Sequence, residues 1–177
     1  MAKLVKPFRA SRNKGKYRVE GRAKIDSGAD ATVFGKDVAC DLDPNFDERP
    51  EAFGEGGGRP RLRGHRGGGG TNRVGEKRGK VDVFVPTHEV VEREGREEFR
   101  ELRRPPRVLI GHDWLQEAKV RLTFGRRHAS MDGVLRSAST KPDGTVSGFV
   151  VRRPTKAERA LIRRSNLRKV CPIRRKR

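Results

Sequence analysis

Apolar and aromatic side chains are scarce in this sequence. Hydrophobic residues make up 32% of the 177 positions and aromatic residues 6%, with one tryptophan and one tyrosine. Charged residues reach 37% and glycine occupies 21 positions. We therefore expect only part of the chain to build a packed core. The length suits one domain with extensions and is too short for two good cores.

Long apolar runs and clusters of metal-ligand residues are missing as well. No run approaches the ~20 residues that a membrane-spanning helix needs, and no apolar signal core follows the basic start, so no membrane partner is expected. Cys40 and Cys171 lie far apart and show no metal spacing. We expect reduced thiols in a cytoplasmic protein, with one disulfide as the open alternative. Neither a metal nor a cofactor is expected, and the four histidines are expected in loops or on the surface.

Acidic residues are too few to balance the basic ones, and the imbalance is confined to the two ends. The formal net charge is +20; residues 1–22 carry +7, residues 126–177 carry +13, and the middle is neutral. This distribution indicates a neutral domain with basic extensions. We expect a flexible basic arm over 1–15, a domain over 16–125 and a basic extension over 126–177. The basic termini suggest nucleic acid or another polyanion as a partner.

Alternation of apolar and polar residues predicts several strands. The clearest are 17–25, 107–111 and 120–124, and a further strand over 80–85 is expected to stop at Pro86. Weaker signals at 131–135 and 146–151, around Asp143-Gly144, suggest a hairpin.

Helical spacing is limited to three short segments. Phe34, Val38 and Leu42 recur every four residues, and 112–118 can form a turn of helix with Trp114 in the core. The sequence Thr155-Lys156-Ala157-Glu158 fits a capping box and predicts a basic helix over 155–170.

Two segments are expected to pack poorly. Residues 54–79 contain 11 glycines, which lose much backbone entropy on ordering, and residues 89–107 are dominated by charges of both signs. We expect a flexible flap or insertion at 54–79 and a solvated insertion at 89–107.

The candidate chemistry lies at the end of the strand predicted over 17–25. Asp26 follows it directly, and then come Ser27, Gly28 and Ala29. Glycine permits close backbone approach, alanine lets a second copy of the loop pack, and serine can hydrogen-bond across such a contact. Two carboxylates at close range share a proton and divide acid and base roles. On this tetrapeptide alone, however, an ordinary turn aspartate is the better interpretation.

A second motif favours the catalytic interpretation of Asp26 over that of an ordinary turn aspartate. The string Asp26-Ser27-Gly28-Ala29-Asp30 resembles the catalytic D-[ST]-G-A motif of the retropepsin-like (retroviral-type, peptidase A2) aspartic proteases. Leu109-Ile110-Gly111-His112-Asp113-Trp114-Leu115 is similar to the second hallmark of that family, an apolar pair, a glycine, any residue, a polar residue and a hydrophobic pair. Both motifs occur in the family's order, and the resemblance covers roughly residues 16–125.

The resemblance implies an all-β, single-domain, closed acid-protease fold with one short helix, plus a basic C-terminal helix outside the family core. It implies that the strand of Leu109, Ile110 and Gly111 passes through a loop of the chain against the catalytic turn. Asp113 would have a structural hydrogen-bonding role. The glycine-rich segment falls where the family places its substrate-covering flap.

The implied activity is hydrolysis of peptide bonds in a protein or peptide substrate. Asp26 would be catalytic, Ser27 would brace the loops, Gly28 would help bind substrate backbone, and Asp30 would hold the loop or the dimer contacts. Only one Asp-Ser-Gly exists in the chain, so the dyad requires a homodimer.

Two departures from the family pattern leave an alternative open. Asp26 and Gly111 are separated by 85 positions, longer than in compact viral members, and the basic C-terminal part has no counterpart. The alternative is an inactive scaffold of the same fold that dimerises and binds nucleic acid through its basic tails.

Overall fold

The computed structural model describes residues 4–56, 60–103, 107–124, 129–132 and 150–165, and within them the protein is predominantly β. The first half contains β1 (Leu4–Arg12), β2 (Tyr17–Ile25), β3 (Val33–Phe34), α1 (Lys36–Leu42), the 3-10 turn η1 (Phe46–Glu48), β4 (Glu51–Glu55), β5 (Leu62–Arg66), β6 (Thr71–Val74) and β7 (Lys77–Gly79). The second half contains β8 (Phe84–Arg93), β9 (Arg96–Glu101), β10 (Val108–Ile110), α2 (His112–Glu117), β11 (Arg121–Phe124), β12 (Ala129–Asp132), β13 (Val150–Arg152) and α3 (Lys156–Arg164).

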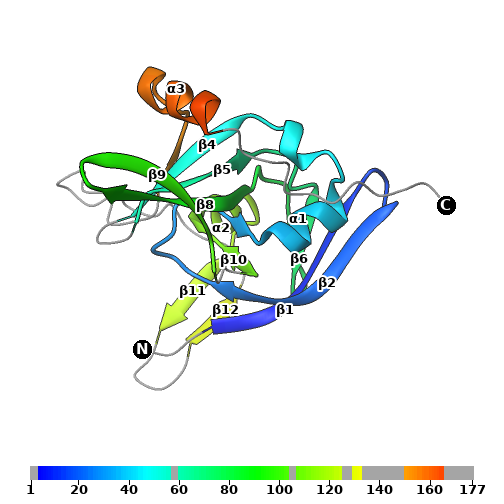
Figure 1. The fold of residues 1–177 in the computed structure, drawn as a ribbon. Helices are drawn as coiled ribbons and strands as arrows, with labels where there is room; N and C mark the ends of the chain where they lie inside the picture. The colour runs from blue at the N-terminus through cyan, green and yellow to red at the C-terminus, as the bar shows by residue number, and fades with distance from the viewer. Residues whose placement is uncertain (1–3, 57–59, 104–106, 125–128, 133–149, 166–177) are drawn as a thin grey trace.

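One large sheet joins most of the strands. Its order is β13-β4-β5-β8-β3-β10-β2-β1-β6-β7, with β9 added to β8, and β11 and β12 form a separate hairpin. Figure 1 shows the β8–β9 hairpin projecting from the body, and α3 and the β11–β12 hairpin at opposite ends of the view. The expectation of an all-β protein is confirmed at this level, although the domain holds two short α-helices, α1 and α2, where one was expected.

The main core is formed by side chains of β1, β2, β3, β6, β8 and β10 together with α1 and α2. Phe8 and Phe34 meet edge to face with ring centroids 5.4 Å apart, and Ile110 and Trp114 are fully buried beside them. Trp114 is thus a core residue, as predicted. Edge-to-face pairs and buried aromatic area contribute strongly to such a core.

The prediction of a flexible arm over 1–15 is wrong for the described part of that segment. Leu4–Arg12 is a strand paired along its whole length with β2. Leu4, Phe8 and Ala10 alternate along it and are buried. The period-2 signal was present in the sequence, but basic residues between the apolar positions obscured it.

The glycine-rich segment is also more ordered than expected. It contributes β5, β6 and β7 to the sheet. A side chain at Gly64 would lie 2.1 Å from the carbonyl oxygen of Val85, and one at Gly69 would lie 2.4 Å from that of Val81. These glycines therefore permit close packing of neighbouring chain segments, in addition to the tight turns expected of them.

Pro86 does not end the strand that contains it. Residues 80–83 lie outside any strand, and β8 begins at Phe84 and continues to Arg93. Opposite Pro86 the register with β5 shifts between Arg63 and Gly64. A bulge of this kind tolerates a proline, because the missing N–H falls where the ladder is already interrupted.

Within the charged segment 89–107, residues 89–101 form the outer part of β8 together with β9, and most of their side chains are exposed. Most of the hairpin expected between 131–135 and 146–151 lies outside the described residues; where the structure describes its ends, β12 pairs with β11 and β13 pairs with β4. Asp143-Gly144 and residues 166–170 of the expected helix lie outside the described residues. The capping box of Thr155 and Glu158 is confirmed, and it opens α3.

Two expectations about reactive side chains need correction. Cys40 is disulfide-bonded, so the expectation of a reduced thiol is wrong and the cysteines no longer support a reducing compartment. His65 lies buried on β5 and His88 half-buried on β8, because the glycine-rich and charged segments pair as strands. No helix in the described ranges is long and apolar enough to cross a membrane.

Candidate active site at the Asp26 turn

The Asp26 turn begins where β2 leaves the sheet. The N–H of Asp26 donates to the carbonyl oxygen of Ile110 at 3.0 Å, which ties the turn to β10. The N–H of Ala29 then donates to the carbonyl oxygen of Asp26 at 3.2 Å and closes the turn. These two bonds fix the backbone on which the carboxylate stands.

The Asp26 carboxylate is held on both sides. Its Oδ1 accepts the N–H of Gly28 at 3.1 Å, and its Oδ2 lies 3.2 Å from Nζ of Lys24. The side chain remains 27% exposed, so it is oriented by the turn and still reachable from solvent. Ser27 and Gly28 beside it are exposed as well.

Strand β10 lies between the two strands that flank the turn. It is parallel to β2, with Ile110 opposite Ile25, and antiparallel to β3, with Leu109 opposite Val33. The chain therefore leaves β2, makes the Asp26 turn and forms β3, and the later β10 fills the gap between them. The sequence-based expectation that this strand passes through a loop of the chain against the turn agrees with this arrangement.

Gly111 is placed where only glycine fits. A Cβ built on it would lie 2.4 Å from the carbonyl carbon and oxygen of Ala31 and 2.9 Å from the carbonyl oxygen of Ala29. The next residue, His112, donates its N–H to that same oxygen of Ala29 at 2.6 Å. The turn after Asp26 thus packs backbone to backbone against the start of α2.

Asp113 anchors the far end of the turn. Its carboxylate accepts the N–H of Thr32 at 3.0 Å, the hydroxyl of Thr32 at 2.7 Å and the N–H of Trp114 at 2.7 Å. Oγ1 of Thr32, which is fully buried, also accepts the N–H of Gly111 at 3.1 Å. Three donors compensate the desolvation of the carboxylate and lock the two sequence motifs together.

Asp30 contributes in two different ways. Its carbonyl oxygen accepts the N–H of Asp113 at 3.2 Å, which adds to the bracing of the turn. Its Oδ2, however, is buried and has no hydrogen-bond partner within the described part of the chain. Buried acceptors of this kind are satisfied in most proteins, by another protein group or by an ordered water.

A second group of functional interest covers the β4–β5 hairpin. Strand β13 pairs with β4, and Arg152 forms a fork with Glu158, whose two carboxylate oxygens each lie 2.7 Å from a guanidinium nitrogen. Arg152 also binds Glu55 on β4, and Arg61 lies 3.6 Å from Glu158. The guanidiniums of Arg152 and Arg61 lie over the ring of Phe53.

This network perturbs the ionisation of its members. The Arg152 hydrogen bonds lower the pKa of Glu158 to about 2, against the opposing effect of burial, and those bonds hold the pKa of Arg152 above its ordinary value. The C-terminal segment is thereby fastened to the hairpin by a fixed ion pair.

The structure brings together nearly all of the residues that the sequence singled out. Asp26 to Asp30 form one turn, and Leu109, Ile110, Gly111 and Asp113 pack against it. Sequence reasoning missed Thr32, Lys24 and the pair of Arg152 and Glu158. Thr32 carried a usable signal, as a polar residue between apolar neighbours immediately after the motif. The other three depend on contacts that local pattern does not reveal.

No cluster of three or more histidine, cysteine or acidic side chains among residues 4–56, 60–103, 107–124, 129–132 and 150–165 is arranged to hold a metal ion. No family model, curated protein or solved structure matches the chain.

Proposed function

We propose that the chain is an aspartic endopeptidase of the retropepsin-like type, active as a homodimer. The observation that carries this proposal is the Asp26 turn itself. It connects β2 to β3, and β10 lies between these two strands and pairs with both. Gly111 and Asp113 brace the turn at the positions where the resemblance places the second hallmark. A plain turn aspartate has no need of such a support.

In the proposed dimer, the Asp26 side chains of two copies hold one water between them. One carboxylate takes a proton from the water as its oxygen attacks the scissile carbonyl carbon. The other, protonated, donates to the carbonyl oxygen, and collapse of the tetrahedral intermediate breaks the C–N bond with a proton delivered to the leaving amine. No covalent acyl-enzyme forms.

Several features of the turn support a second copy at this face. Ser27 and Gly28 are exposed, and Oδ2 of Asp30 is buried without a donor in the described residues. On β1, Val5 stands opposite Lys24 in the ladder and is a large hydrophobic side chain left exposed, at 37%. An isologous contact around a two-fold axis would cover these groups together.

The β4–β5 hairpin is the proposed substrate-covering flap. Its connection contains the first glycine run, and β4 and β5 lie within or beside the segment 54–79 in which the resemblance places the flap. On this proposal, β13 and α3 fasten the edge of the flap.

The test compares wild type with Asp26→Asn on a peptide library, with and without pepstatin. Asparagine preserves an oxygen for the Gly28 N–H, so the fold is retained while proton transfer is lost. Asp37→Asn is the matched control, because Asp37 is an exposed residue of α1 whose carboxylate lies 3.8 Å from Arg107 and forms no other ion pair with the described residues. We expect pepstatin-sensitive cleavage by wild type and the control, and at least a ~1000-fold loss in Asp26→Asn. Equal cleavage by wild type, Asp26→Asn and Asp37→Asn would contradict the proposal.

The alternative function is an inactive scaffold of the same fold that binds nucleic acid through its basic tails. It is favoured by the strongly basic termini. If wild type shows no cleavage at all, while the protein still dimerises, this alternative replaces the enzyme.

A further inference from the structure

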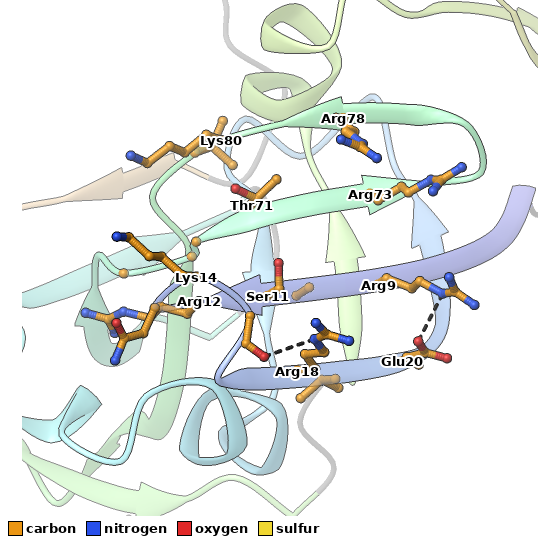
Figure 2. Close-up of a pocket in the computed structure, with 18 of the residues that line it drawn as sticks. Arg9, Ser11, Arg12, Lys14, Arg18, Glu20, Thr71, Arg73, Arg78 and Lys80 are labelled. Carbon is orange, nitrogen blue, oxygen red and sulfur yellow. Dashed lines mark hydrogen bonds and ion pairs between the residues drawn. The ribbon is translucent and has the colours of Figure 1, made fainter.

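A basic hollow lies away from the Asp26 turn. It has a volume of about 1080 Å³ and is formed by the β1–β2 hairpin on one side and residues 68–82 on the other. Figure 2 shows basic side chains from both hairpins bordering this hollow. We name it the basic cleft; its cationic residues are Arg9, Arg12, Lys14, Arg18, Arg73, Arg78 and Lys80.

The acidic side chains of the basic cleft do not neutralise it. The lining holds seven cations and two acids, Glu20 and Asp82, and one of the cations, Arg12, is ion-paired with Asp43 outside the lining. Glu20 is already committed to Arg9, with Nε and Oε1 3.1 Å apart. The cleft therefore keeps a net positive charge, although residues 23–125 as a whole are neutral.

The sheet register places three of the arginines in one row. Arg9 on β1 stands directly opposite Arg73 on β6, and Arg73 stands directly opposite Arg78 on β7. Neighbouring strands lie about 4.8 Å apart, and like charges directly opposite each other destabilise a sheet. A row of this kind is unfavourable without a ligand and becomes favourable when an anionic chain lies across it.

Two arginines of the basic cleft are oriented in advance. Nε of Arg18 donates to the carbonyl oxygen of Gly15 at 2.9 Å, and Nε of Arg73 donates to that of Gly75 at 3.0 Å. These bonds occupy the inner nitrogen and direct the terminal nitrogens, which are the ones that bind phosphate oxygens in pairs. Arg78 and Lys80 form no ion pair within the part of the chain that the structure describes.

The neutral lining favours contact with a phosphate backbone. Ser11, Asn13 and Thr71 supply hydrogen-bond donors between the cations, and none of the described residues that line the cleft is aromatic. Proteins that bind single strands without sequence preference use a positive groove that follows the backbone. A concave hollow receives a flexible strand more readily than a stiff duplex.

We propose that the basic cleft binds single-stranded nucleic acid through its phosphate backbone, with little preference for sequence. This site is separate from the Asp26 turn, and it takes four of its seven cations from the basic segment 1–22 and three from residues 68–82. Binding is salt-dependent, because each phosphate contact releases condensed counterions.

The experiment measures binding of a labelled 12-nucleotide single strand by fluorescence anisotropy, on full-length wild type and on Asp26→Asn. The test variant is Arg73→Glu/Arg78→Glu, and the matched control is Arg93→Glu/Arg96→Glu. The control changes the same charge at the tip of the exposed β8–β9 hairpin, outside the cleft. We expect the cleft variant to bind at least ~10-fold more weakly and the control to stay within ~2-fold of wild type.

A second, milder variant distinguishes the loss of cations from misfolding as the cause of weaker binding. Arg73→Gln/Arg78→Gln removes two cations, and we expect its salt dependence, the slope of log K against log salt, to be shallower by about 1.4 for a single strand. Its melting temperature should equal or exceed that of wild type, because the like-charge row is relieved.

Three results would overturn the proposal. The first is an equal loss of binding in the cleft variant and the β8–β9 control, which would assign binding to total charge. The second is binding of a duplex of equal length as tightly as the single strand. The third is competition by inorganic tripolyphosphate as effective as by the single strand at equal phosphate concentration. Because Asp26→Asn is tested in parallel, the result is independent of proteolysis.

Discussion

Gly111 is the residue at which the Asp26 turn tolerates least change. Replacing it with alanine would force a methyl group to within 2.4 Å of the Ala31 backbone, and backbone atoms there have no flexible end that can move aside. We expect Gly111→Ala to lower the free energy of unfolding by about 2–4 kcal/mol, through strain in the backbone contact between the turn and α2. Urea unfolding followed by circular dichroism measures this loss.

Gly21 provides the matched control for that substitution. It also lies in the sheet, on β2, but a Cβ added there meets nothing within 4 Å. Gly21→Ala should therefore leave stability within ~0.5 kcal/mol of wild type or raise it slightly, because alanine restricts the unfolded chain more than glycine does. Similar losses for both variants would contradict the close approach at Gly111.

Sequence reasoning was most successful at this residue scale. Asp26, Gly111 and Asp113 were placed at one site because two short motifs carry recognisable chemistry. Thr32 was missed, although it receives and donates the hydrogen bonds that join those motifs. The role of Thr32 is visible only in the folded chain, because its partner Asp113 lies 81 positions away in the sequence.

At the scale of elements, the ion pair of Arg152 and Glu158 adds to the backbone pairing that attaches β13 and α3 to β4. Glu158 is 4% exposed and has a pKa of about 2 in the folded protein, against an ordinary value of 4.5. A carboxyl with a depressed pKa adds stability that is fully present above 4.5 and is lost as the pH falls toward 2. The C-terminal segment should therefore detach from the hairpin in acid before the core unfolds.

Glu158→Gln tests that attachment. Glutamine retains the cap of α3 but removes the charge that Arg152 binds, so we expect the segment to lose roughly 2 kcal/mol of local stability at neutral pH. Hydrogen exchange of β4 and α3 amides measures it: exchange should be faster than in wild type at pH 7 and similar to wild type near pH 2.

Arg159→Gln is the control for this experiment. Arg159 lies on the same helix but is exposed, and the substitution also changes one charge. Its exchange pattern should follow wild type at both pH values. A pH-independent difference between Glu158→Gln and wild type would show that lost packing, and not the ion pair, holds the segment.

The elements themselves were predicted unevenly, for physical reasons. Strand β2 and helix α2 carry strong local periodicity and were predicted. Strand β1 was hidden because the basic residues Lys6 and Arg12 interrupt the buried positions Leu4, Phe8 and Ala10, and β5 to β7 were hidden by glycines that permit close approach between strands. The pairing of β13 with β4 joins segments almost 100 positions apart, and no local pattern specifies such a partner.

At the scale of the whole molecule, net charge and dimerisation oppose each other. Each copy carries +20, so two copies in the proposed dimer repel, and salt weakens that repulsion. Added salt should therefore tighten the dimer while it loosens nucleic acid in the basic cleft. Sedimentation at 50 and 500 mM salt measures the dimerisation equilibrium. We expect added salt to strengthen dimerisation and to weaken nucleic-acid binding.

The requirement for two copies of Asp26 can be tested by mixing chains. Wild type is incubated with an equal amount of Asp26→Asn at 500 mM salt until subunits have exchanged, and the control receives the same amount of Asp37→Asn. If each dimer needs both carboxylates, random pairing leaves only about half of the wild-type chains in active dimers, so cleavage per wild-type chain falls about two-fold. In the control, both partners supply Asp26, and total cleavage rises in proportion to the protein added. Unchanged activity per wild-type chain in the first mixture would mean that one Asp26 suffices, and the shared-water mechanism would be wrong even though the chain is a protease.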